Sequence, residues 1–205
     1  MSDSHRKAIS LGITGGIACG KSEVGRILGE MGFAVCDADR VAHDLMEKGK
    51  PVFQQIIHHF GDDVLTEDGR ISRSDLGKMV FEEPSRLQLL NMLVHPAVRQ
   101  ELEKWMAVQK KENRPSAVLL PLLFESGMDD LNWDVVVCVS SAEPSVFQRL
   151  EKRGLSPEEA EQRVLSQMPL AEKESRADVV INNLGTLGEL ELAVRETVKA
   201  IMLER

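Results

Sequence analysis

One short segment combines glycines, a lysine and a serine in an order suited to holding phosphate. Residues 12–22 read GITGGIACGKS, and within them Gly15-x-x-x-x-Gly20-Lys21-Ser22 fits the phosphate-binding loop pattern. In that pattern, glycines let backbone N–H groups turn toward phosphate oxygens, the lysine faces the β- and γ-phosphates, and the serine hydroxyl suits Mg²⁺. The spacing therefore predicts a site for a nucleoside triphosphate with Mg²⁺, and phosphoryl transfer as its chemistry.

The whole loop is expected to contact the nucleotide, because main-chain groups do most of the holding. Cys19 allows two interpretations: a small buried residue, or a thiol whose pKa is lowered at a helix N-terminus and which is therefore sensitive to alkylation. Ser22 is also a predicted Mg²⁺ ligand. The residues predicted to bind the nucleotide here are Gly15, Gly16, Ile17, Ala18, Cys19, Gly20, Lys21 and Ser22.

Other nucleotide-binding patterns are absent from the sequence. No G-x-G-x-x-G occurs, which disfavours a dinucleotide-binding enzyme. No aspartate is followed three residues later by glycine and no NKxD occurs, so the signatures of a GTPase switch are missing. A kinase or another user of ATP remains as the best interpretation.

Two carboxylates, those of Asp37 and Asp39, follow the strand predicted over residues 33–36. A kinase needs a residue that orients or deprotonates the attacking hydroxyl near the γ-phosphate, and Asp37 and Asp39 are candidates for that role. Asp39 is the better candidate for the base, with Asp37 as its support or as a Mg²⁺ neighbour. Asp39 could instead be the N-cap of the next helix, and the two roles can coexist.

Strand and helix patterns alternate around these residues. Runs of strand character are each followed by a helical pattern, which implies a parallel sheet covered on both faces. We therefore expect an α/β fold with a three-layer α/β/α core of the phosphate-loop type and a five-stranded parallel sheet. Residues 48–114 contain helical patterns alone and are predicted to be a helical insertion between strands. The predicted strands cover residues 9–13, 33–36, 117–123, 134–139 and 178–181.

Composition limits the remaining function classes. The 205 residues carry a formal net charge of −8, which argues against a general nucleic-acid or anionic-membrane surface. The three cysteines are an odd number without a CxxC pair, so a reducing cytoplasm is the expected location. Residues 1–10 lack the apolar run of a signal peptide, and no run is long enough to span a membrane.

An ordered set of segments through nearly the whole chain resembles the dephospho-CoA kinase family. The phosphate loop alone would not justify that comparison, but the order of all the segments together does. They are GITGGIACGKS, DADRVAH at 37–43, DGRISRSDLGKMVF at 68–81, VHP at 94–96, PLLFESG at 121–127, QRLEKR at 148–153, Gln167, AD at 177–178 and Asn183-Leu-Gly185.

The resemblance implies an ATP-dependent phosphotransferase that phosphorylates the ribose 3'-hydroxyl of 3'-dephospho-CoA, the last step of coenzyme A biosynthesis. It further implies that Lys21 steadies the transferring charge, that Asp39 accepts the hydroxyl proton, and that Arg149 is the catalytic arginine. Asn183 and Gly185 would form the adenine-side loop. For Arg149 an ordinary solvated helix face, and for Asn183 and Gly185 a simple turn, remain alternatives.

The same resemblance divides the chain into functional parts. Residues 1–47 would begin the core, 48–115 would be the acceptor-binding insertion, 116–148 would continue the core, 149–176 would be the lid, and 177–205 would complete the core. The expected state is a monomer or small homo-oligomer. Two competing functions stay open: a kinase of another small molecule, or a nucleotide-dependent switch whose insertion is a partner surface.

Overall fold

The computed structural model describes residues 8–204, apart from the side chains of Phe81 and Glu82. The expectation that the chain begins without a signal peptide rests on residues 1–10, and residues 1–7 lie outside the described residues. Two compact units are present, one containing the residues up to 36 and from 106 onward and the other containing residues 37–105. Within residues 8–204, no helix is both long and apolar enough to cross a membrane.

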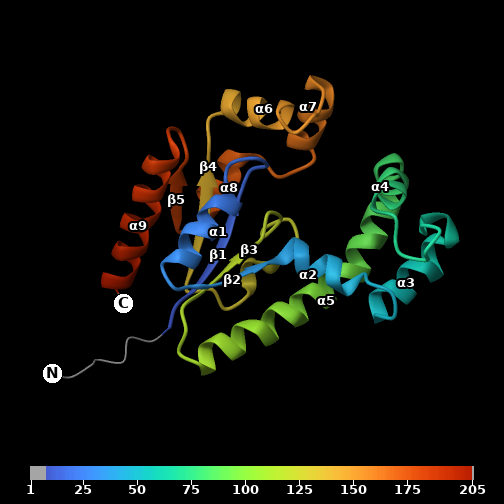
Figure 1. Ribbon diagram of the computed structural model, residues 1–205, viewed down its shortest axis with the longest axis horizontal. Helices are drawn as coiled ribbons and strands as arrows, with labels where there is room; N and C mark the ends of the chain where they lie inside the picture. The colour runs from blue at the N-terminus through green and yellow to red at the C-terminus, as the bar shows by residue number, and fades with distance from the viewer. Residues whose placement is uncertain (1–7, 205) are drawn as a thin grey trace. The chain divides into compact units, whose positions relative to one another are not determined.

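The first unit is built on a parallel sheet, which confirms the predicted α/β fold. Figure 1 shows its five strands in the order β2-β3-β1-β4-β5. Described in chain order, the strands are β1 Ser10–Gly15, β2 Ala34–Asp37, β3 Ser116–Leu119, β4 Val135–Ser140 and β5 Val179–Asn182. The helices of this unit are α1 Lys21–Glu30, η2 Met128–Asp130, α6 Glu143–Glu151, α7 Pro157–Leu165, α8 Leu170–Arg176 and α9 Leu187–Leu203.

Successive side chains of each strand point to opposite faces of the sheet, and both faces are apolar. One set of strand residues forms a buried cluster with α1 and α9, which contact each other. The intervening residues, among them Val136 and Cys138, point to the other face, where α8 contacts β1 and β4. The strand members of the first cluster are Leu11, Ile13, Ala117, Leu119, Val135, Val137, Val139 and Ile181.

The strand predicted over residues 117–123 is shorter than expected. β3 ends at Leu119, and residues 121–127 form turns in which Leu123 and Phe124 are buried. Pro121 has no backbone N–H to donate, so it cannot continue a sheet ladder. Leu123 and Phe124 accordingly belong to the core, whereas Leu122 is exposed.

The second unit is helical among its described residues. Its elements are α2 Ala38–Leu45, α3 Pro51–Phe60, η1 Asp62–Val64, α4 Arg73–Glu82 and the greater part of α5 Pro84–Lys111. α3 buries one apolar face, formed by Val52, Phe53, Ile56 and Phe60, and α5 continues through Pro96 as a single helix. The sequence prediction of a helical region is therefore confirmed for the elements described, and the one addition among them is an isolated antiparallel bridge between Leu65 and Ile71.

The cap of α2 differs from the expectation for Asp39. Asp37 is the N-cap: its Oδ1 atom accepts hydrogen bonds from the backbone N–H groups of Asp39 at 2.9 Å and Arg40 at 3.4 Å. Aspartate is favoured at this position because its carboxylate satisfies N–H groups that have no partner within the helix. The interpretation of Asp39 as N-cap is therefore wrong, and Asp39 lies in the first turn of α2.

A buried ion pair fastens α8 to the turn after β3. The side chain of Lys173 is fully buried, and its Nζ atom lies 2.7 Å from both Glu125 Oε1 and the Pro121 carbonyl oxygen. Glu125 Oε1 also accepts a hydrogen bond from the backbone N–H of Met168 at 3.0 Å. A charge removed from water in this way needs its partners, because an unpaired charge in the interior is costly.

We predict that Lys173→Met lowers the free energy of unfolding by about 3 kcal/mol, because it leaves Glu125 partly buried without its cation. A matched control is Arg195→Met in α9, which breaks an exposed pair with Glu191 and should cost about 1 kcal/mol or less. Urea denaturation of the two variants measures the difference. Equal losses of stability would show that the Lys173 pair does not anchor α8.

Candidate active site

The loop after β1 presents backbone donors in the manner required of a phosphate cradle. Gly15 ends β1 and Lys21 begins α1, so the loop lies between a buried strand and a helix N-terminus. Among the described residues, the backbone N–H groups of Ile17, Ala18 and Gly20 have no hydrogen-bond partner. Donors of this kind beside the positive end of a helix dipole form an anion-binding site.

Two glycines of the loop occupy positions that a side chain could not. Gly15 has φ 140°, and a Cβ atom there would lie 2.2 Å from the carbonyl oxygen of Val139. Gly20 has φ 107°, and a Cβ atom there would lie 2.4 Å from Nδ2 of Asn183. Both the backbone conformation and the close approach of Val139 in β4 and of Asn183, the residue after β5, therefore require glycine.

Lys21 folds back over the loop. Its Nζ atom donates hydrogen bonds to the carbonyl oxygens of Gly15 at 3.0 Å and Gly16 at 2.7 Å. These contacts hold the ammonium group on the loop itself, next to the donors that would receive phosphate. The role of this lysine as a cation facing bound phosphates stays a prediction.

Arg149 joins the loop to the end of β4. From α6, its Nη1 atom donates to the carbonyl oxygen of Ala18 at 2.9 Å and to Ser141 Oγ at 3.2 Å. Within the described part of the chain, no carboxylate pairs with this guanidinium. Arg149 therefore faces the phosphate loop rather than lying on an ordinary solvated helix face.

Asn183 supports the loop from the end of β5. Its side chain is buried, and its Nδ2 atom donates to the carbonyl oxygen of Cys19 at 2.9 Å. The carbonyl of Asn183 in turn accepts a hydrogen bond from Ser141 Oγ at 2.8 Å. Gly185 lies two residues later, beside the capping box of Thr186 and Glu189 that begins α9. A simple turn alone does not account for Asn183, because its amide holds the loop.

Cys19 is buried, and the expectation of a lowered pKa is wrong. Burial raises the pKa of the Cys19 thiol, although Lys21 and Arg149 act in the opposite direction. The side chain is 1% exposed and belongs to the apolar cluster of the sheet. Cys19 is therefore the small buried residue of the two interpretations, and its thiol is not an activated nucleophile.

The two predicted carboxylates lie in the second unit. Asp37 ends β2 and caps α2, and Asp39 follows in the first turn of that helix.

Across residues 8–204, no group of three or more His, Cys, Asp or Glu side chains is arranged to hold a metal ion. A Mg²⁺ ion that accompanies a nucleotide needs fewer protein ligands, because phosphates and water supply the rest. The exposed hydroxyl of Ser22 at the start of α1 and the carboxylate of Asp37 are hard oxygen donors of the type this ion prefers.

Sequence reasoning missed Ser141 and the pairing of Lys173 with Glu125. Ser141 links Arg149 to Asn183, and the buried pair of Lys173 and Glu125 fixes α8, the last helix of the predicted lid segment. The signal for Ser141 was its place directly after a buried strand, at the carboxyl end where loop residues gather. No local pattern identifies the Lys173 pair.

We predict that Cys36, which is partly exposed, reacts with iodoacetamide at pH 8 much faster than Cys19 and Cys138 in the folded protein. Burial raises the pKa of Cys19 and raises that of Cys138 to about 12, so little of the reactive thiolate form exists at either position. Mass spectrometry of modified peptides measures the three rates, with urea-unfolded protein as the control. Rates for Cys19 and Cys36 that agree in the folded protein would contradict the burial described here.

Comparison with known proteins places this arrangement in a family. The family model described as dephospho-CoA kinase matches residues 9–189. A dephospho-CoA kinase of Symbiobacterium thermophilum is 44% identical over 191 residues, which cover 93% of this chain and 80% of the relative. A dephospho-CoA kinase of Bacillus cereus is 45% identical over 194 residues, covering 93% of this chain and 96% of the relative.

A solved structure agrees with the sequence matches. The dephospho-CoA kinase from Campylobacter jejuni superposes with a TM-score of 0.72 at 28% identity, covering 95% of this chain and 98% of that structure. The family match includes the phosphate loop, Asp39, Arg149 and Asn183. The chain therefore belongs to the dephospho-CoA kinase family.

Proposed function

We propose that this chain transfers the γ-phosphate of ATP to the 3'-hydroxyl of the ribose of 3'-dephospho-CoA, giving CoA and ADP. The observation that carries the proposal is the family match over residues 9–189, which extends from the phosphate loop to the start of α9. The loop supports the use of a nucleoside triphosphate, because its free N–H donors and Lys21 suit a polyphosphate.

The reaction requires positioned charge rather than a covalent intermediate. Backbone donors of the loop would bind the phosphates, and Lys21 would exchange its contacts with the loop carbonyls for contacts with phosphate oxygens. Arg149 already touches the loop through Ala18, and its fork of donors suits phosphoryl oxygens. These groups would stabilise the negative charge that spreads over the transferred group.

Asp39 is proposed as the base that orients the acceptor hydroxyl and accepts its proton. Its carboxylate is not needed for the cap of α2, because Asp37 supplies that cap. Ser22 and Asp37 are proposed to hold Mg²⁺, which would neutralise charge on the phosphates when bound. Gly185 and the backbone near Asn183 are proposed to face the adenine, while the Asn183 side chain supports the loop.

The remaining assignments concern segments and location. Residues 48–115 are proposed to bind the acceptor, and residues 149–176 are proposed to form a lid over the phosphates. Burial of Lys173 supports placing the fixed end of that lid in α8. The cytoplasm is the proposed location, a choice supported by three cysteines without a disulfide. A monomer or small homo-oligomer without nucleic-acid or membrane partners is proposed as the working state.

We predict that Lys21→Ala and Asp39→Ala each lower kcat at least about 100-fold, because each removes a group proposed to act on the reacting atoms. Asp39→Ala leaves the cap of α2 in place, since the cap uses only the backbone N–H of Asp39. Asp63→Ala, a change of an exposed carboxylate in the same unit, is the matched control and should retain normal turnover. An Asp39→Ala enzyme with near-normal kcat would remove Asp39 from the base role.

We predict that 3'-dephospho-CoA, among a panel of nucleosides, nucleotides and other alcohols, is the acceptor that supports fast ADP release from MgATP. The product should be heavier than the acceptor by one phosphate, as measured by mass spectrometry. Efficient phosphorylation of a different acceptor would indicate another small-molecule kinase. ADP release that no acceptor stimulates over many turnovers would favour a nucleotide-dependent switch.

A further inference from the structure

The helical unit contains a pocket whose lining residues have no individual role in the proposal above. Its volume is about 780 Å³, within the range of small-molecule sites. The end of α2 lines one side, and residues 66–74, which lead into α4, line the other. All of its lining residues lie between 43 and 74, so the pocket belongs entirely to the second unit.

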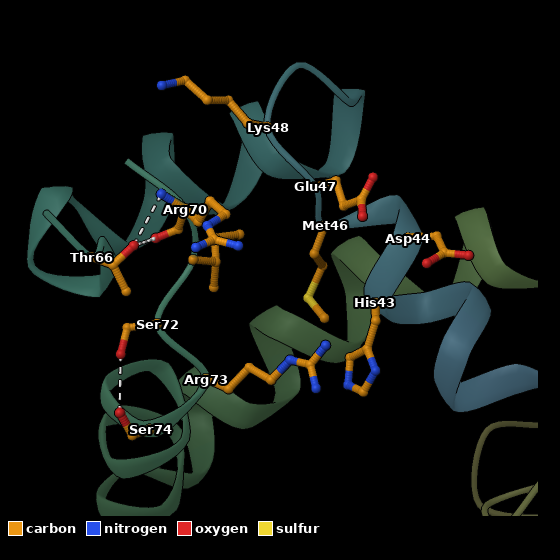
Figure 2. Close-up of a pocket in the computed structure, with 11 residues that line it drawn as sticks. His43, Asp44, Met46, Glu47, Lys48, Thr66, Arg70, Ser72, Arg73 and Ser74 are labelled. Atoms are coloured by element: carbon orange, nitrogen blue, oxygen red, sulfur yellow. Dashed lines mark hydrogen bonds between the residues drawn. The ribbon is translucent and has the colours of Figure 1, made fainter. Parts of the chain in front are cut away.

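Two basic side chains converge in this pocket. Figure 2 shows the guanidinium of Arg73 and the imidazole of His43 pointing toward one another beneath Met46, while the carboxylates of Asp44 and Glu47 point away from them. In the described part of the chain, neither Arg73 nor His43 has a hydrogen-bond or ion-pair partner. Five guanidinium donors and an imidazole at one place therefore remain available to a ligand.

Arg70, the neighbouring arginine of the pocket, is engaged differently. Its Nε atom donates to Asp68 Oδ2 at 2.6 Å, and Asp68 also accepts a hydrogen bond from Thr66. The hydrogen bond from Thr66, followed by that from Arg70, lowers the pKa of the Asp68 carboxyl, so this carboxylate is charged and neutralises Arg70. Arg73 has no such carboxylate partner among the described residues, and Lys48, the other cation of the lining, points away from Arg73 and His43 in Figure 2.

The pocket begins one helical turn from the proposed base. Asp39 and His43 are four residues apart in α2, so they lie on the same face of the helix about 6 Å apart along its axis. In 3'-dephospho-CoA, the ribose that carries the 3'-hydroxyl also carries a 5'-diphosphate. An acceptor hydroxyl held at Asp39 would therefore place a doubly anionic group within reach of His43 and Arg73.

We propose that Arg73, assisted by His43, binds the 5'-diphosphate of the acceptor in this pocket. The inference rests on the proposed function and assigns residues to its acceptor site. A guanidinium suits this ligand because its planar donors engage two phosphate oxygens at once, and it is always charged. The acceptor is then fixed at two points, the diphosphate at Arg73 and the hydroxyl at Asp39, which orients it for transfer.

The test compares Arg73→Met with Arg86→Met, an arginine-to-methionine change in the same unit but outside the pocket. Arg73→Met should raise the KM for 3'-dephospho-CoA about 10- to 100-fold, the scale of hydrogen bonds to a charged group, and leave the KM for ATP unchanged. Calorimetric titration of 3'-dephospho-CoA without ATP should show the same weakening of Kd. Arg73→Lys should give a smaller increase, because it keeps the charge and loses the fork.

The outcomes separate this inference from the proposed function. A wild-type enzyme that phosphorylates 3'-dephospho-CoA, combined with an Arg73→Met variant whose KM for it changes less than twofold, overturns the inference alone. Equal increases in both KM values, or equal effects of Arg73→Met and Arg86→Met, also overturn it. Wild-type protein that does not use 3'-dephospho-CoA overturns the proposed function and this inference with it. Thermal unfolding of each variant checks that it is folded.

Discussion

The fixed shape of the phosphate loop depends on hydrogen bonds to its carbonyl oxygens. Lys21, Arg149 and Asn183 donate to carbonyls of Gly15, Gly16, Ala18 and Cys19. Because the carbonyls are held in this way, the neighbouring N–H groups are left to face a ligand. Two of the three donors come from chain segments more than 100 residues away, so the loop is shaped by the sheet as a whole.

The loop and its flanking elements could be predicted because their signals are local. Glycine spacing, the lysine and the following helical pattern lie within a few residues of one another. The order of the strands and helices followed from alternating periodicities. These features depend on short-range geometry, which a sequence displays directly.

Other features were hidden because they depend on contacts between distant residues. Nothing near Lys173 in the sequence indicates that it pairs with Glu125, 48 residues earlier, or that the pair is buried. Cys19 lies at a helix N-terminus, which argues for a lowered pKa, yet packing against the sheet raises it instead. The sequence suggested Asp39 as an N-cap, yet Asp37, an aspartate two residues earlier, holds that position. Burial and competition between neighbours decided these cases.

Burial of Lys173 has a consequence for chemical modification of the folded chain. Reagents that acylate amines reach exposed lysines first, while the Nζ atom of Lys173 is closed off by Glu125 and the Pro121 carbonyl. Acylation of the Lys173 Nζ atom would therefore require a transient local opening in which α8 detaches from the sheet. Acylation of Lys173 is covalent, so it would remain detectable after α8 had closed again.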